Sequence, residues 1–249
     1  PRLDQKQVND AFFFGGYPEP FLKREDKQFY SLWMKNYFQT YLNRDVRRLF
    51  PALNFQAFQR FIGMLGASNG QLIKVSDYSG PIDVSEPTAK KYFQIAEGTF
   101  LWRNLPSYQK SHKKRLVKMS KGHIRDSGLS HYLGFIKTKE ELDHHPKVGL
   151  RWESFVIEQL LLTLNDQLID YRAFHYRTHN QVEIDLILEG PWGVIPIEIK
   201  MGKSTEHKTL KILENFISQH HCPFGIIINQ ANDCYWASEN VAQIPLTFW

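Results

Sequence analysis

Apolar residues recur at helical spacing through two stretches in the first third of the chain. Residues 28–50, "QFYSLWMKNYFQTYLNRDVRRLF", and residues 54–67, "NFQAFQRFIGMLGA", each predict an amphipathic helix. The positions assigned to the buried stripes are Leu32, Tyr37, Tyr41, Val46 and Leu49 in the first helix and Phe55, Phe58, Ile62 and Leu65 in the second. Upstream, "FFFGGYPEPF" (12–21) contains glycines and prolines that exclude one long helix.

The next segment, residues 71–108, predicts two helices joined by a tight turn. A short helix near 74–79 is followed by Gly80-Pro81, and a second helix is expected from Ser85 to about Glu97. Ser85 is a favourable N-cap residue, and Pro87 suits the first turn of a helix. This is a helix-turn-helix pattern. The runs "TFLWRNLP" and "KKRLVKM" are then expected to form the two strands of a wing, so that a winged helix-turn-helix occupies about residues 68–125.

A helix followed by several strands is predicted in the second half of the chain. Residues 149–166 have the pattern of an amphipathic helix, and "QLIDYRAFHYRT", "QVEIDLILEG" and "WGVIPIEIK" have the pattern of strands. A helix through "EHKTLKILENFISQH", the strand "FGIIIN" and a short terminal segment follow. The prediction is a multi-domain α/β protein: a helical and winged-helix part at 1–137, then a mixed sheet flanked by helices at 138–249.

Two of these strands place acidic residues where they can meet. Alternation in "VEIDLIL" puts Val182, Ile184, Leu186 and Leu188 on one face and Asp185 on the other, and alternation in "VIPIEIK" directs Glu198 and Lys200 to one face together. The turn "EGPWG" lets the strands pair as a hairpin, which brings Asp185 next to Glu198. Two carboxylates on adjacent strands suit Mg²⁺ or Mn²⁺, and such an ion can polarise a phosphodiester.

The residues just after "VIPIEIK" resemble the end of an ATP-binding P-loop, but the full P-loop motif is not present. Gly202-Lys203-Ser204 fits the last three positions of G-x-x-x-x-G-K-[ST], yet Ile197 stands where the first glycine is required. Glu198 would also repel a phosphate. We therefore predict a turn leading into a helix and no P-loop in this chain.

Charged residues are unevenly distributed along the chain. Residues 1–130 hold 21 Lys or Arg against 11 Asp or Glu, whereas the rest of the chain is acidic. The basic residues expected to face nucleic acid are Lys90, Lys91, Lys110, Lys113, Lys114, Arg115 and Lys118. Helix-turn-helix units also dock proteins and charge runs are usually solvated faces, so nucleic-acid contact and a protein-docking role both stay open.

Composition favours a cytoplasmic protein. Hydrophobic residues make up 42% and charged residues 23% of the chain. No apolar run approaches the roughly 18 residues that a membrane helix needs, and no secretory signal is recognisable. Two cysteines suit a reducing compartment.

The carboxylate and lysine pattern resembles the PD-(D/E)XK nuclease superfamily, in which an acidic residue on one strand is followed by E-x-K on the next. A further Glu on the helix before the strands is common in that superfamily, and Glu153 has that place. The resemblance implies that Asp185 and Glu198 bind the ion, that Glu153 assists as a ligand or through water, and that Lys200 positions the nucleophile. The alternative is that these are solvent-facing charges on an exposed sheet.

Segments along nearly the whole chain are similar to the C-terminal region of prokaryotic AAA-type ATPases. These segments are "GGYPEP", "YLNRDVRRLF", "DVSEPTAKKYFQIAEGTFLWRNLPSY", "KRLVKMSKGHIRDSGL", "WESFVIEQL" and "VEIDLILEGPWGVIPIEIK". In that group a P-loop ATPase domain precedes a winged helix and a nuclease-like domain. The resemblance implies an ATPase domain upstream, so that ATP would bind only outside this chain. Expected partners are nucleic acid, with DNA favoured, and ATPase domains or protomers. A non-catalytic assembly module that regulates the ATPase is the alternative.

Overall fold

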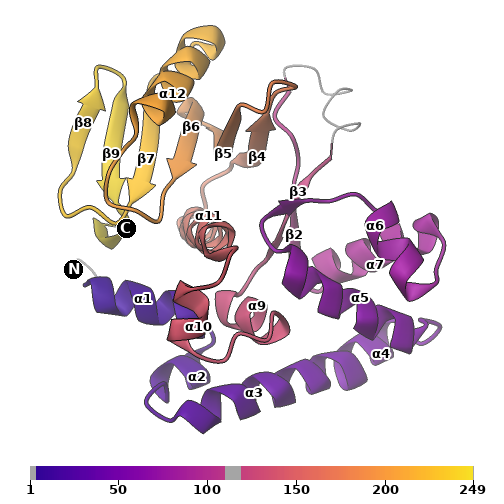
Figure 1. Ribbon diagram of the computed structural model, residues 1–249. Coiled ribbons are helices and arrows are strands. Elements are labelled where there is room, and N and C mark those ends of the chain that lie inside the picture. Colours follow the sequence, from indigo (N-terminus) through magenta and orange to yellow (C-terminus); the bar gives the residue numbers. More distant parts are fainter. Residues whose placement is uncertain (1–3, 110–118, 249) are drawn as a thin grey trace. The chain divides into compact units, whose positions relative to one another are not determined.

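The computed structural model describes residues 4–109 and 119–248 (Figure 1). They form two compact units, each assembled from separate stretches of sequence. The helical unit comprises residues 9–104 and 122–154, and the sheet unit comprises the described parts of 1–8, 105–121 and 155–249. The chain is thus a multi-domain protein of mixed α/β class, as the hydrophobic pattern predicted.

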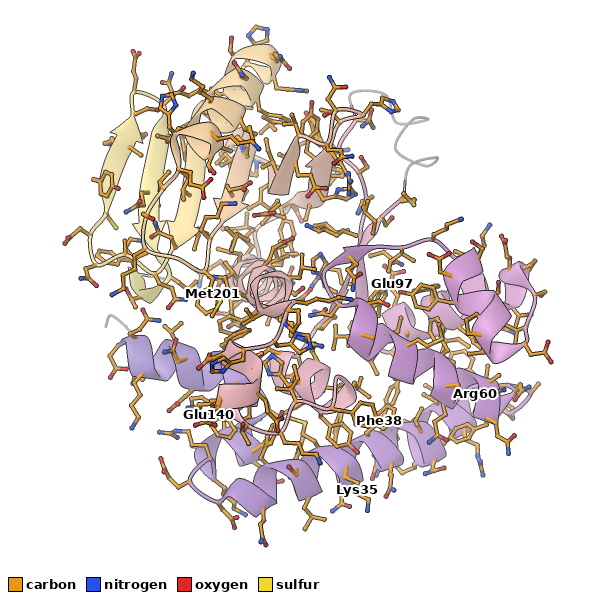
Figure 2. The ribbon with its side chains drawn as sticks, viewed as in Figure 1. Lys35, Phe38, Arg60, Glu97, Glu140 and Met201 are labelled. Atoms are coloured by element: carbon orange, nitrogen blue, oxygen red, sulfur yellow. The ribbon has the colours of Figure 1, made fainter. Side chains whose placement is uncertain are left out.

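The helical unit is built mainly from short helices. In chain order its elements are α1 (Gln5–Phe14, which begins in the sheet unit), α2 (Pro18–Leu22), α3 (Lys27–Thr40), a π-helical stretch η1 (Tyr41–Val46), α4 (Arg47–Leu49), α5 (Phe55–Ser68), β1 (Gln71–Leu72), α6 (Ser76–Ser79), a 3₁₀ turn η2 (Gly80–Ile82), α7 (Glu86–Gly98), β2 (Trp102–Leu105), β3 (Lys121–Ile124), α9 (Ser127–Leu133), α10 (Lys139–Asp143) and the first part of α11 (Val148–Asp166). The labelled Arg60 and Glu97 mark α5 and α7 in Figure 2.

Side-chain caps fix where several of these helices begin. Asp26 accepts hydrogen bonds from two backbone N–H groups at the start of α3, and Asn54 accepts one at the start of α5. The Ser85 hydroxyl accepts the N–H of Thr88 at 3.3 Å, which confirms the predicted N-cap of α7. Each cap satisfies a donor that the helix itself leaves without an acceptor.

The predicted buried stripe of the first long helix is wrong in part. Leu32 is 57% exposed and Leu49 is 62% exposed, whereas Tyr30 and Met34 are buried. Leu49 follows η1, and a π-helical turn changes the number of residues per turn and with it the face that each later residue occupies. Leu32 precedes η1, and in that part of α3 the buried face is the one that carries Tyr30 and Met34. The stripe of α5 is confirmed at Phe58, which is fully buried together with Ile62 and Leu65.

The two helices predicted on either side of Gly80-Pro81 are present as α6 and α7, with η2 between them, and a small sheet includes the strands that follow. β3 lies between β1 and β2 in the order β1-β3-β2. β2 lies within the predicted first wing strand, and β3 begins at Lys121, after the run 113–119 that was expected to form the second. Most of that run lies outside the described residues.

Two glycines of α5 provide a matched test of packing in the helical unit. An alanine Cβ at Gly66 would lie 2.7 Å from the backbone carbonyl of Leu133 in α9, whereas a Cβ at Gly63 meets nothing within 4 Å. We expect Gly66→Ala to cost about 1–3 kcal/mol through overpacking. Gly63→Ala is expected to stabilise the helix by up to about 1 kcal/mol. Urea unfolding of both variants measures the difference, and equal effects would contradict the close α5–α9 packing.

The sheet unit is a six-stranded mixed sheet with the order β4-β5-β6-β7-β9-β8. Its elements after α11 are β4 (Arg172–Arg177), β5 (Glu183–Gly190), β6 (Gly193–Ile199), α12 (His207–His220), β7 (Gly225–Asn229), β8 (Tyr235–Ser238), β9 (Val241–Pro245) and a 3₁₀ turn η3 (Leu246–Phe248). β4, β5 and β6 pair antiparallel, whereas β6, β7 and β9 pair parallel. The terminal segment therefore adds two strands that the sequence pattern did not predict.

The helix α12 supplies the crossover that parallel pairing of β6 and β7 requires, and it lies against one face of the sheet (Figure 1). Its Leu213, Phe216 and Ile217 share a buried cluster with Ile187 of β5 and Ile227 of β7. Gly202-Lys203-Ser204 forms the bend before this helix, as predicted. The apolar contacts anchor β5 and β6, which carry the candidate site.

Candidate functional site

The β5–β6 hairpin brings Asp185 and Glu198 together, as the sequence predicted. Leu186 pairs with Ile197 in the antiparallel register, so the next position places Asp185 opposite Glu198. The Asp185 carboxylate accepts the backbone N–H of Ile199 at 2.8 Å. A tight turn between Gly190 and Gly193 connects the two strands, so their pairing needs no distant part of the chain. Gly193 adopts a positive φ of 88°, which glycine tolerates without strain.

Lys200 lies beside the acidic pair. Its ammonium Nζ donates to Glu198 Oε1 at 2.7 Å, and 39% of its side chain is exposed. Met201, labelled in Figure 2, directly follows it in the loop after β6. Three of the four residues predicted for the catalytic site therefore gather in the sheet unit.

Strict alternation along β5 is wrong. Phe174 of β4 pairs with Ile187, while Tyr176 pairs with Ile184, so two residues of β5 lie opposite His175 alone. This is a β-bulge, which changes the direction of side chains locally and is common beside active sites. Ile187 is fully buried in the same cluster as Ile184, three residues earlier, so the side chains of β5 do not alternate regularly.

The two carboxylates are buried, which contradicts the alternative of an exposed, solvated sheet face. The side chains of Asp185 and Glu198 are 12% and 11% exposed. Burial raises the pKa of Asp185, against the opposing effect of Lys121. Burial and the nearby charge of Asp185 raise the pKa of Glu198 to about 7. Burial therefore disfavours the ionised form of both carboxyl groups, and a bound cation would stabilise that form.

One oxygen of the Glu198 carboxylate is also available to bind a divalent ion. Within residues 4–109 and 119–248, Glu198 Oε2 is buried without a hydrogen-bond partner. A buried carboxylate oxygen without a donor is costly unless something binds it. No group of three or more His, Cys, Asp or Glu side chains among the described residues is arranged to hold a metal. Asp185 and Glu198 would thus supply two ligands, and waters or backbone oxygens the others.

Glu153 lies on the part of α11 that belongs to the helical unit. Its side chain is buried, with 6% of the residue exposed. Its assignment as a further ligand remains a prediction.

Lys121 is a site residue that sequence analysis missed. Its Nζ lies 3.9 Å from Asp185 Oδ1, and its side chain is only 9% exposed. In the sequence it belongs to the basic stretch 110–125, which was expected to face phosphates or solvent and not a buried carboxylate. No local pattern distinguishes it from its neighbours.

The residues predicted to contact nucleic acid are described only in part. Lys90 and Lys91 are exposed on α7, where a partner can reach them. Lys110, Lys113, Lys114, Arg115 and Lys118 lie outside the described residues.

Fold and site together define a multi-domain α/β protein that carries a buried carboxylate–lysine cluster on a mixed sheet. The chain belongs to the family described as Domain of unknown function (DUF8612), whose model matches residues 5–140. A second model, Domain of unknown function (DUF4143), matches residues 148–249.

Two mycobacterial proteins are similar to most of this chain. "Uncharacterized protein Mb2031c" of Mycobacterium bovis and "Uncharacterized protein Rv2008c" of Mycobacterium tuberculosis are each 31% identical over 186 residues, which is 75% of this chain and 41% of theirs. The chain thus spans less than half the length of these relatives. No solved structure matches it significantly. Among the described helices, none is long and apolar enough to cross a membrane.

Proposed function

We propose that this chain is a nucleic-acid-associated part of an AAA-type ATPase system, with a PD-(D/E)XK nuclease-like domain that hydrolyses phosphodiesters using Mg²⁺ or Mn²⁺. The observation that carries the proposal is the buried pair Asp185 and Glu198, with Lys200 hydrogen-bonded to Glu198. A helix, a strand with an acid and a following strand with E-x-K succeed one another in α11, β5 and β6, which supports the nuclease-like assignment.

In this proposal Asp185 and Glu198 would hold the ion, and the ion would supply Lewis-acid activation of a water and of the phosphodiester. Lys200 positions the attacking water or stabilises charge on the phosphate, because its partly exposed ammonium can reach a ligand while it contacts Glu198. Burial of the carboxylates excludes competing water and strengthens their attraction for a cation.

The helical unit supports nucleic-acid association. Its chain order α5, β1, α6, α7, β2, β3 with sheet order β1-β3-β2 supports a winged helix. Its second helix, α7, exposes Lys90 and Lys91, which suits contact with phosphates. ATP would act through a domain outside this chain, since DUF4143 domains are commonly associated with AAA-type ATPases. That association also keeps regulation of the ATPase by a non-catalytic module as the second candidate.

Calorimetry with Mn²⁺ tests the site directly. The wild-type chain should bind the ion, and Glu198→Ala should abolish measurable binding, because the variant removes one of two protein carboxylates. Glu214→Ala, at an exposed position on α12, serves as the matched control and should bind like wild type.

Cleavage of labelled single-stranded and duplex DNA and RNA follows under the same conditions. Mn²⁺-dependent cleavage that is lost in Glu198→Ala would support the nuclease assignment. A wild-type chain that binds no divalent ion would overturn it and favour the regulatory module.

A further inference from the structure

Lys121 has the properties of a second cationic group in the candidate site. It lies at the start of β3, far in sequence from β5 and β6, yet its ammonium is 3.9 Å from Asp185. Burial of an ammonium is unfavourable unless opposite charge or ligand atoms compensate it. Its side chain is more deeply buried than that of Lys200, at 9% against 39% exposed.

Contacts with β4 fix the backbone just before Lys121. The Nε2 of the buried His175 lies 3.1 Å from the carbonyl oxygen of Met119. The backbone of His175 also pairs with the segment after β2. Its carbonyl oxygen accepts the Tyr108 N–H at 2.6 Å, and its N–H donates to the Pro106 carbonyl at 3.0 Å. These hydrogen bonds hold the backbone next to Lys121 within the sheet unit, where the lysine side chain reaches Asp185.

Its geometry with Asp185 is that of an ion pair, not of a hydrogen bond. A separation of 3.9 Å exceeds the usual N–H···O range, and Asp185 already accepts the Ile199 N–H. Asp185, Glu198, Lys121 and Lys200 together carry no net charge when all are ionised. With one divalent ion the cluster becomes positive, which complements a phosphodiester and an attacking hydroxide.

We propose that Lys121 is a phosphate-binding residue of this site, which contacts a non-bridging oxygen of the nucleic-acid backbone. The inference rests on the proposed function, because it assigns the substrate's phosphate to the same cluster. The competing explanation is that Lys121 serves only as a counterion for Asp185.

A comparison in the Asp185→Asn background separates the two roles. That substitution removes the anion, so a lysine that is only a counterion has no further effect on DNA affinity. It also allows Lys121→Gln to be introduced without leaving an unpaired buried charge. Fluorescence anisotropy with a short labelled DNA duplex, measured over a range of salt concentrations, reports both affinity and the number of phosphate contacts.

We expect Lys121→Gln to weaken DNA binding by Asp185→Asn about tenfold, as loss of a hydrogen bond to a charged group implies. The slope of log affinity against log salt should fall by about 1. Lys121→Arg keeps the charge and should keep the slope, and Lys208→Gln, on the exposed surface of α12, controls for general loss of charge.

The outcomes distinguish this inference from the proposed function. If the wild type binds Mn²⁺ and DNA but Lys121→Gln changes neither affinity nor slope, Lys121 is only a counterion and the inference is overturned alone. Loss of slope in Lys121→Arg, with its charge retained, would also contradict it. A wild type that binds neither ion nor DNA overturns both.

Discussion

Replacing Arg151 by methionine is expected to lower the melting temperature of the helical unit. The decrease should be larger than that caused by single substitutions at the surface or in the loops of this unit. Arg151 is 3% exposed on α11. Its guanidinium donates to the carbonyl and hydroxyl oxygens of Ser130 at 3.1 and 2.7 Å and to the Gly66 carbonyl at 3.0 Å. One side chain thus ties α11 to α9 and α5.

The expected size follows from hydrogen bonds that involve a charged donor. Methionine preserves much of the volume but leaves two buried carbonyl oxygens without these donors, and we expect a loss of about 3 kcal/mol. For a chain of this size that corresponds to roughly 6–12 °C in melting temperature. Calorimetric or circular-dichroism melting measures it.

Arg48→Met is the matched control, because Arg48 is exposed on α4 and the same side-chain change should be nearly neutral there. Burial lowers the pKa of Arg151 to about 10, which shows that its charge is costly to bury. A melting temperature unchanged in Arg151→Met would mean that relief of this cost cancels the lost hydrogen bonds.

Features that depend on neighbouring residues in the sequence were predictable. Ser85 caps α7, Gly80-Pro81 lies between α6 and α7, and α12 begins after the Gly202-Lys203-Ser204 bend. Each results from the local chemistry of a cap or turn. The helix face of Leu49 was not predictable, because this residue follows the π-helical stretch, and the face of Leu32 depends on distant packing partners of α3.

The same distinction holds for the site. Asp185 and Glu198 meet across a hairpin with a short turn, so the pattern of two strands was enough to pair them. Lys121 lies far upstream of Asp185 in the sequence, and their ion pair is a non-local contact that no periodicity predicts. The β-bulge opposite His175 could not be predicted from the sequence of β5 either, because a bulge is defined by the pairing with β4.

Glu198→Gln is expected to stabilise the cation-free protein above neutral pH while it abolishes stabilisation by Mn²⁺. The pKa of Glu198 is raised from 4.5 to about 7, chiefly by burial and then by the charge of Asp185. Between these values the folded state binds more protons than the unfolded state. The free energy of unfolding therefore falls as pH rises through this window.

Glutamine resembles the protonated acid and cannot ionise, so the variant lacks this fall in stability. At about pH 8 we expect it to exceed wild type by on the order of 2 kcal/mol, with melting curves that converge near pH 4. Thermal melting of both proteins across pH, without cation and then with Mn²⁺, measures the two effects. Wild type should gain stability from the ion in proportion to its binding, and the variant should gain none.

A variant that is less stable than wild type at high pH would show that the 2.7 Å ion pair with Lys200 outweighs the burial of the carboxylate. Such a result would indicate a structural role for Glu198. Gain of stability with loss of ion binding is instead typical of a binding site, where a group is held in an unfavourable environment because its ligand requires it there. The direction of this one change in melting temperature therefore distinguishes a site built for a cation from a salt bridge built for the fold.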